Sequence, residues 1–293
     1  MNRTITYQIE KEYESIFAFF KQNNMPHKIQ VQLKQNPGQV LVNHKPVMLR
    51  TPLHPRDTLT LHIMETEHSD ITPVEMPLDI VYEDEDILVV NKPALLPVHP
   101  SIRHYEDTLA NGVMHYFQKE DSPFVFRCLN RLDRDTSGLT LIAKNPFSAA
   151  MLSRQVKNRQ LHRTYVALVE GELPGSGTID APIARAKDSA ILREINRESG
   201  QPAITHYTCM EKRNGLSLAS ITLETGRTHQ IRVHMTSIGH PLPGDFLYNP
   251  SNKQMQRQAL HSASLAFTHP VTGQMLTFHA TIPKDMQQLL ESQ

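Results

Sequence analysis

The stretch RLDRDTSGL at residues 131–139 decides how this sequence is interpreted. Its first half is charged, and its second half leads into GLTLIAKN at 138–145, which has the apolar pattern of a strand. Asp133 therefore lies in a loop that leads into a predicted strand. Two arginines, Arg131 and Arg134, flank it closely.

Strand-like stretches follow one another on both sides of this loop, with few helices between them. The strand-like stretches are 86–93, 164–171, 205–213, 217–224 and 274–281, and the helix-like ones are 108–118 and 145–160. In the second of these helices, Asn145 is the predicted N-cap and Pro146 the first helical residue. Strands outnumber helices and do not alternate with them regularly. This order predicts an α+β domain with a mixed, largely antiparallel sheet and argues against a doubly wound fold.

Residues 1–72 are predicted to form a smaller unit of two short helices and a compact β-hairpin region. Its strand-like stretches are 4–10, 39–47 and 58–65, and its helix-like stretches are 13–22 and 27–35. This order resembles the small alpha-L type RNA-binding domain of many RNA-modifying enzymes, and an ordinary small α+β unit is the alternative. The polar stretch HSDITPVEMP at 68–77 is typical of a linker. We therefore divide the chain into 1–72 and 73–293 and expect the two parts to move semi-independently.

The bulk composition narrows the function classes. Lys and Arg together number 30, and so do Asp and Glu, so a nucleic-acid surface would have to be a local patch. Two cysteines are too few for a disulfide framework or a cysteine-based zinc site. No apolar run approaches the roughly 18 residues that span a bilayer, and the first residues lack the apolar core of a signal peptide. A cytoplasmic location without membrane partners is expected.

Residues 131–138 resemble the R-L-D-x-x-T-S-G signature of the RluA-type pseudouridine synthases. Four more blocks of that family occur in the same order, and they lie at 86–93 with 98–100, at 163–171, at 202–207, and at 226–235 with 239–241 and 244–245. The resemblance implies the pseudouridine synthase fold and an isomerase that converts uridine to pseudouridine in structured RNA without a cofactor. Ribosomal RNA is the expected substrate, and transfer RNA is possible.

The resemblance also implies roles for single residues. Asp133 would be the catalytic carboxylate, Arg232 its countercharge and Tyr165 the general base near carbon 5 of the uracil. Leu132 and Ile231 (or Val233) would supply apolar walls. The target uridine must leave its helical stack, and Arg131 would occupy the vacated space or hold the phosphate of the flipped nucleotide.

A basic window surrounds the signature. Residues 126–164 contain eight basic side chains and two acidic ones, which predicts an RNA-contacting surface. The side chains expected to bind substrate or RNA, besides Arg131, Leu132 and Ile231, are Lys92, Arg134, Arg163, Arg227, His229 and Gln230. Lys92 could equally be an ordinary strand end. The chain departs from the family pattern at Asn130, Arg163 and Pro243 and throughout 184–198, which bears on the choice of RNA.

Several alternatives stay open at this point. A non-catalytic RNA-binding or ribosome-assembly factor could keep the same fold. A hydrolytic nucleosidase would need a second carboxylate, for which only Asp135 and Asp245 are available in the blocks. Asp135 is more simply a loop residue in an Asx-type turn. The histidines at 229, 234 and 240 lack the spacing of a zinc site, so no metal is expected.

The sequence does not indicate which RNA or which uridine is modified. It also leaves open a nucleophilic or an elimination mechanism at Asp133, RNA binding by residues 1–72, and the oligomeric state. No obligate protein partner is predicted.

Overall fold

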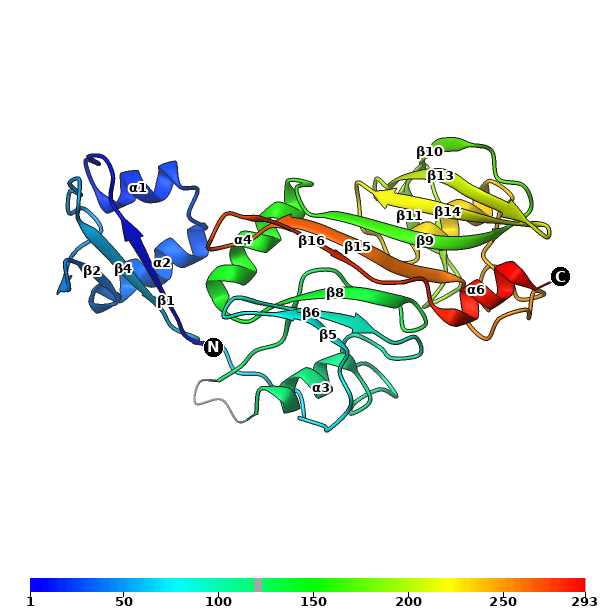
Figure 1. Ribbon diagram of the computed structural model, residues 1–293, viewed down its shortest axis with the longest axis horizontal. Helices are drawn as coiled ribbons and strands as arrows, with labels where there is room; N and C mark the ends of the chain where they lie inside the picture. The colour runs from blue at the N-terminus through cyan, green and yellow to red at the C-terminus, as the bar shows by residue number, and fades with distance from the viewer. Residues whose placement is uncertain (119–122, 293) are drawn as a thin grey trace.

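The protein is elongated, with a small sheet at the N-terminal end and a long sheet through the rest (Figure 1). The computed structural model describes residues 1–118 and 123–292. Along its main path the long sheet has the order β10 (Ser176–Asp180), β13 (Ile204–Arg213), β14 (Leu216–Leu223), β9 (His162–Glu170), β15 (Leu260–Thr268), β8 (Ser137–Ala143), β6 (Ile87–Lys92), β5 (Ile80–Glu83). Two short strands join this path, β16 (Met275–His279) on β15 and β7 (Arg127–Cys128) on β8.

The long sheet is mixed and largely antiparallel, which confirms the predicted fold class. β8 and β15 run parallel, with His261 opposite Ser137, whereas the other neighbouring strands described for this sheet are antiparallel. β8 is buried along its whole length, as its apolar sequence predicts. The sheet therefore fixes the position of the loop that precedes β8, and that loop carries Asp133.

Four helices accompany the long sheet. They are α3 (Leu109–Tyr116), α4 (Pro146–Lys157), α5 (Gln230–Ser237) and α6 (Lys284–Glu291). The predicted start of α4 is confirmed, because the Asn145 side chain accepts a hydrogen bond of 2.9 Å from the amide of Ser148. The motif blocks gave no indication of α5, although it carries Arg232. A separate hairpin of β11 (Ile183–Arg185) and β12 (Arg193–Ile195) lies in the stretch that matches the family pattern poorly.

The N-terminal unit has the predicted elements. Its sheet has the order β1 (Arg3–Gln8), β4 (Thr58–Ile63), β2 (Val40–Val42), β3 (Lys45–Pro46), and it packs with α1 (Ile16–Gln22), α2 (His27–Gln35) and the short 3-10 helix η1 (Pro37–Gln39). The apolar residues spaced along both helices, such as Ile16, Phe20, Ile29 and Leu33, are fully buried in one core.

Contacts join this unit to the rest of the chain and argue against the expected semi-independent movement. Phe147 of α4 is 1% exposed and belongs to the core of the N-terminal unit, and α2 lies beside α4 (Figure 1). Arg3 binds Asp86 through two hydrogen bonds of 3.0 Å. Arg127 binds Glu65 through two more, of 2.7 and 2.8 Å. Burial and charge thus join the two parts, and the boundary at residue 72 stays a prediction.

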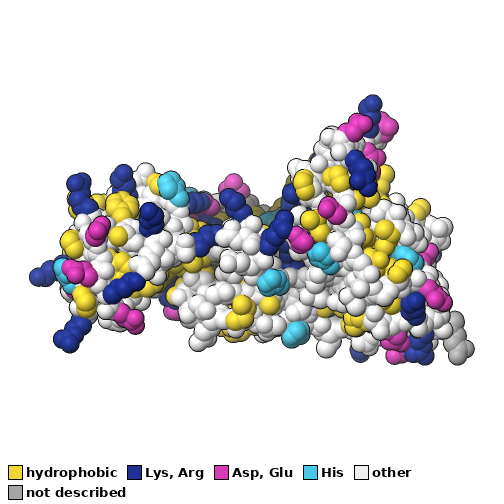
Figure 2. Space-filling model, turned by 90° about the horizontal axis from the view of Figure 1, so that it is seen from above, with side chains coloured by type: hydrophobic (Ala, Val, Ile, Leu, Met, Phe, Trp, Pro, Cys, Tyr) yellow, Lys and Arg dark blue, Asp and Glu magenta, His cyan; other side chains and the backbone are white. Residues whose placement is uncertain are grey.

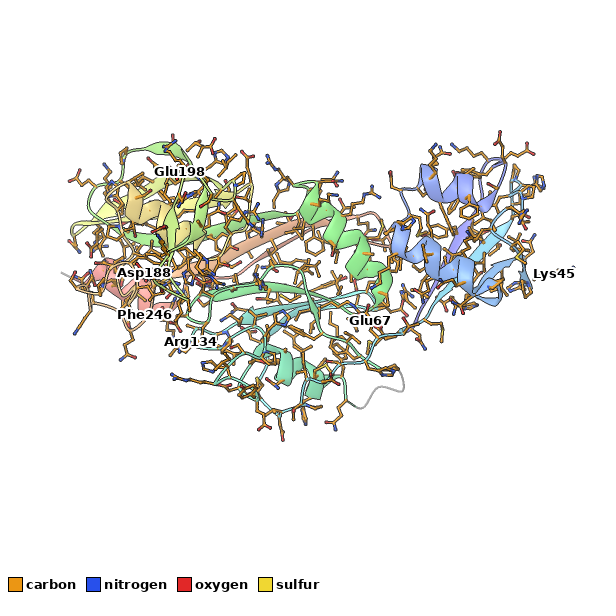
Figure 3. The ribbon with its side chains drawn as sticks, turned by 180° about the vertical axis from the view of Figure 1, so that it is seen from behind. Lys45, Glu67, Arg134, Asp188, Glu198 and Phe246 are labelled. Atoms are coloured by element: carbon orange, nitrogen blue, oxygen red, sulfur yellow. The ribbon has the colours of Figure 1, made fainter. Side chains whose placement is uncertain are left out.

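The predicted linker is also held in place. The side chain of Asn111 in α3 donates to the carbonyl of Thr72 (2.8 Å), and the amide of Val74 donates to the carbonyl of Asn111 (3.1 Å). Ile71 packs against the main core. Figure 3 shows Glu67 close to α4 and Lys45 at the far end of the N-terminal sheet. Within the described residues, no helix is long and apolar enough to cross a membrane.

Candidate active site

The loop between β7 and β8 turns sharply and presents Asp133. The amide of Thr136 donates to the carbonyl of Asp133 at 3.1 Å, which closes the turn. Gly138 follows with φ +112°, and a Cβ there would lie 2.3 Å from the carbonyl oxygen of Ser262 in β15. Glycine is therefore required where the loop enters the parallel pair of strands. The T-S-G part of the signature has a structural purpose, because Ser137 Oγ also meets Nδ1 of His261 at 2.9 Å.

Buried polar side chains hold this loop from the inside. Asn130 is 2% exposed and ties the loop to β8, donating to the carbonyl of Leu139 (2.9 Å) and accepting from the amide of Leu141 (2.8 Å). Asn130, one of the departures from the family pattern, is thus a structural support of the loop. Gln258 donates to the hydroxyl of Thr136 at 3.2 Å.

Lys92 belongs to this support and does not reach the substrate surface. It is fully buried, and its ammonium donates to the carbonyls of Pro93, Leu96 and Arg134 at 2.8, 2.7 and 3.1 Å. Burial lowers the pKa of Lys92 to about 7, against the attraction of Asp135 and Asp133. The expectation that Lys92 binds RNA therefore fails on geometry, because all three of its donors are used within the protein.

Arg232 lies against Asp133, as predicted. Its Nη1 donates to Oδ2 of Asp133 at 2.9 Å, and the arginine is 2% exposed. The rest of the guanidinium binds Asp245, which is fully buried, through Nε (2.6 Å) and Nη2 (2.8 Å). Burial alone would lower the pKa of Arg232, but the hydrogen bonds to Asp245 and the charges of both carboxylates raise it. Asp133 is consequently paired with a permanent cation whose direction is fixed.

Aromatic and imidazole rings enclose this ion pair. The guanidinium carbon of Arg232 lies 5.0 Å from the ring centroid of Tyr248. The Tyr248 hydroxyl meets Nδ1 of His229 at 2.9 Å, and Nε2 of that histidine lies 3.9 Å from Asp133. Burial lowers the pKa of His229, an effect that the charge of Asp133 only partly offsets. His229 is thus a neutral neighbour of the carboxylate near pH 7.

Tyr165 stands in β9 and lines the same pocket as Asp133. It is 5% exposed, and burial raises its pKa against the opposing charge of Arg163. The phenol is therefore protonated at neutral pH. Leu132 and Ile231, predicted as apolar walls, are buried and line this pocket as well.

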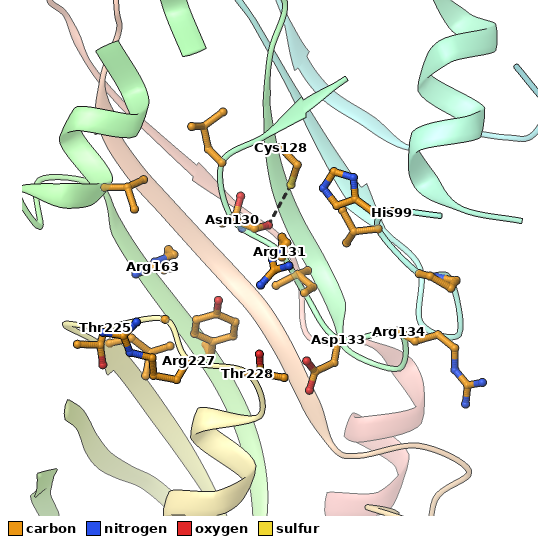
Figure 4. Close-up of a pocket in the computed structure, with 18 of the residues that line it drawn as sticks. His99, Cys128, Asn130, Arg131, Asp133, Arg134, Arg163, Thr225, Arg227 and Thr228 are labelled. Atoms are coloured by element: carbon orange, nitrogen blue, oxygen red, sulfur yellow. Dashed lines mark hydrogen bonds between the residues drawn. The ribbon is translucent and has the colours of Figure 1, made fainter. Parts of the chain in front are cut away.

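This small pocket adjoins a wide cleft. The small pocket has a volume of about 60 Å³ and the cleft about 1030 Å³. Residues lining both include Arg131, Leu132, Asp133, Tyr165, Leu223 and Arg227. Figure 4 shows Arg131, Arg163 and Arg227 around the cleft, with Asp133 at its lower side. A polymer can occupy the wide cleft while a single base enters the small pocket beside it.

Arg134 and Gln230 both have partners within the protein, although Arg134 is exposed and lines the wide cleft. Arg134 binds Asp135 through Nε at 2.6 Å and points away from the cleft centre (Figure 4). Asp135 is thus held by a side chain, and the predicted Asx-type turn is not what fixes it. Gln230 is 2% exposed and donates to the carbonyl of Ile204 and the hydroxyl of Thr205.

Half of the cations of the basic window are neutralised locally. Ion pairs join Arg127 to Glu65, Arg134 to Asp135, Lys144 to Glu83 and Arg159 to Glu224. Within residues 1–118 and 123–292, the other four cations of the window form no ion pair, and three of them, Arg131, Lys157 and Arg163, line the cleft. Nε of Arg163 is buried without any hydrogen-bond partner in the described structure. Fewer cations are therefore available to bind RNA than the sequence of residues 126–164 predicts.

Two residues with a part in the site were not assigned from the sequence. The sequence offered Asp245 only as a possible second carboxylate of a hydrolase, and no motif contained Tyr248. Gly244, with φ +72° and no room for a Cβ, indicates the tight turn that aims Asp245 at Arg232. Asp135 and Asp245 are both buried in ion pairs, so neither faces the pocket as the second carboxylate of a hydrolase.

One cluster has metal-like geometry, formed by Asp84, Asp86 and His269. Its ligand atoms are already used. Asp84 accepts from His269 Nε2 (3.0 Å), and Asp86 accepts from Arg3 and from Asn145 (2.8 Å). The cluster is a polar junction between the two parts of the chain, and its hydrogen bonds explain its geometry without a metal ion.

Comparison with known proteins agrees with the motif blocks. Residues 86–237 match the RNA pseudouridylate synthase family. The chain is 41% identical over 294 residues to a Bacillus subtilis protein described as the uncharacterized RNA pseudouridine synthase YlyB, covering 98% of this chain and 97% of that one. It is 40% identical over 252 residues to the ribosomal large subunit pseudouridine synthase D of Zymomonas mobilis, covering 80% and 78%.

The chain belongs to the RluA family of RNA pseudouridine synthases. It is therefore an isomerase, and its long sheet has the pseudouridine synthase fold. The human RNA pseudouridylate synthase domain containing 1 superposes with a TM-score of 0.59 at 27% identity, covering 74% of this chain and 86% of that one. The family match also covers Asp133, Tyr165 and Arg232, the residues that line the pocket.

Proposed function

We propose that this synthase isomerises specific uridines in ribosomal RNA, with Asp133 as the catalytic carboxylate and without a cofactor. The observation that carries the proposal is the pairing of Asp133 with the buried Arg232 in a small pocket beside an arginine-lined cleft. Relatives named ribosomal large subunit pseudouridine synthase D support ribosomal RNA as the substrate. Transfer RNA is the second substrate to test.

The reaction breaks the bond between ring nitrogen 1 of uracil and carbon 1 of the ribose. The base turns, carbon 5 bonds to the sugar, the proton on carbon 5 leaves, and nitrogen 1 gains a proton. Asp133 acts at the sugar, either as nucleophile or by stabilising positive charge and taking a sugar proton. Arg232 pairs with the carboxylate and directs it into the pocket.

The walls of the pocket bind the flipped base. Leu132 and Ile231 present apolar surface to the uracil, and Tyr165 lines the same pocket, where its phenolate form takes the proton from carbon 5. Arg131 is exposed at the mouth and fills the space that the uridine leaves in the RNA stack. Arg163, Arg227 and His229 complete the RNA side of the cleft.

The test compares pseudouridines in total RNA from cells with and without this protein, mapped by chemical labelling. We expect one or a few positions in ribosomal RNA to lose the modification. Purified protein should restore them, Asp133→Asn should not, and the exposed Asp188→Asn should act like wild type. Loss confined to transfer RNA would overturn the ribosomal assignment, and full activity of Asp133→Asn would overturn the role of Asp133.

A further inference from the structure

The hairpin β11–β12 forms a second cleft beside the active site. Its volume is about 400 Å³, and four arginines line it: Arg131, Arg185, Arg193 and Arg227. Arg131, Gly226, Arg227 and Thr228 also line the main cleft, so the two are continuous. Ser199, Gln201 and Thr228 add polar groups to the wall. Asp133 therefore lies next to a passage with strongly positive walls.

The hairpin register sets two of these arginines against each other. Arg185 lies directly opposite Arg193 in the antiparallel pair. Residues opposite one another on an antiparallel ladder project from the same face with Cβ atoms about 5 Å apart, and like charges there repel. An anion between the two guanidinium groups would remove this repulsion.

No acidic side chain offsets this charge in the described part of the chain. Arg185 forms no side-chain hydrogen bond there. Arg193 donates to the carbonyls of Ile191 and Leu192, and Arg227 donates to that of Pro202. The acidic residues of the hairpin region, Asp188, Glu194 and Glu198, do not line the cleft, and Figure 3 marks two of them. Figure 2 shows basic side chains near the middle of one face as well as at the N-terminal end.

The hairpin is anchored to the catalytic ion pair. The backbone amide of Arg193 donates to the Tyr248 hydroxyl at 2.9 Å, and the ring of Tyr248 lies against Arg232. A strand bound by Arg185 and Arg193 would therefore be held at a fixed offset from Asp133. We propose that this second cleft binds the phosphodiester backbone of the RNA strand next to the flipped uridine, whatever its bases. This inference rests on the proposed function.

The probe is a fluorescent twelve-nucleotide oligouridylate, bound to the full chain over a range of salt concentrations. Arg185→Gln and Arg193→Gln are compared with Arg197→Gln, an exposed arginine of the same hairpin region that does not line the cleft. A phosphate contact on a single strand contributes about 0.7 to the salt slope. Each cleft variant should lose about that amount, so the affinity ratio between 50 and 200 mM salt shrinks about 2.6-fold.

Turnover gives an independent readout. The second cleft binds RNA outside the small pocket that holds Asp133. Arg185→Gln should therefore raise KM and leave kcat unchanged. Arg185 makes no internal side-chain bond, so this variant tests the cleft even if Arg193→Gln disturbs its own turn. Salt slopes equal to those of wild type and Arg197→Gln would overturn the proposal. If the variants change the salt slope but the wild-type protein does not modify ribosomal RNA, RNA binding by the second cleft is supported. Only the assignment of ribosomal RNA as substrate is then refuted.

Discussion

Arg232 and Asp245 form a bidentate ion pair inside the protein, with Nε and Nη2 of the arginine 2.6 and 2.8 Å from the two carboxylate oxygens. Only Nη1 remains for Asp133, at 2.9 Å. The backbone amides of Leu247 and Tyr248 also donate to Asp245, which fixes the carboxylate. Asp133 thus receives its countercharge from an arginine whose direction is fixed by a second, buried carboxylate, that of Asp245.

We therefore expect Arg232→Lys to fail although it keeps the charge. A lysine ammonium cannot bridge two carboxylates with the planar fork of a guanidinium. The loss of one charged hydrogen bond, about 1.5–3 kcal/mol, should lower kcat by roughly tenfold to hundredfold. Arg3→Lys is the matched control, since Arg3 binds Asp86 in the same bidentate way at the domain junction. Wild-type kcat in Arg232→Lys would show that the fork is not needed.

Tyr165→Phe tests the fate of the carbon-5 proton. Release of tritium from RNA labelled at that carbon should fall by roughly 10²–10⁴-fold if the phenol is the base. Because burial raises the pKa of Tyr165, the wild-type rate should also increase with pH as more phenolate forms. The residual rate of Tyr165→Phe should lack that increase, and Tyr207→Phe should behave like wild type. Identical pH profiles for wild type and Tyr165→Phe would assign the proton to another group.

Lys92 predicts a pH dependence of stability. Its pKa is about 7 in the folded protein and 10.5 without burial, so between these values the unfolded chain binds one more proton. The free energy of unfolding should then rise with pH, by up to about 1.4 kcal/mol per unit. The free energy of unfolding is measured with urea at pH 7, 8 and 9. It should rise with pH in wild type and in the exposed control Lys157→Met, and should not rise in Lys92→Met. Parallel curves for wild type and Lys92→Met would mean that the three carbonyls keep the ammonium charged.

The shared core predicts that the two parts of the chain unfold together. Phe147→Ala should lower the free energy of unfolding by about 3–5 kcal/mol, whereas Phe17→Ala, on an exposed part of α1, should change it little. Calorimetry should show a single transition that Phe147→Ala shifts as a whole. A chain beginning at Pro73 would expose Phe147 and remove Arg3 from Asp86 and Glu65 from Arg127, so it should melt well below the full chain. Equal melting temperatures would restore the independent-domain interpretation.

The sequence by itself determined the family, the fold class and the isomerase activity. Motif blocks fixed in order along the chain carry Asp133, Tyr165 and Arg232, and local patterns of apolar residues indicated most strands and the start of α4. These features depend on near neighbours in sequence, for which spacing and turn chemistry are sufficient guides. The RNA role of residues 1–72 stays a prediction.

Tertiary structure alone decided which charges are free and which are consumed. In the sequence, nothing distinguishes the cation of Arg131 from those of Lys92, Arg127 and Arg134. In the structure, the last three donate to carbonyls or carboxylates of the protein, and some of these acceptors lie far away along the chain. The opposed pair of Arg185 and Arg193 depends on a hairpin register, and the direction of Arg232 depends on Asp245. Electrostatic interaction falls with distance in space, so a cation's role is set by the groups that folding brings within a few ångströms.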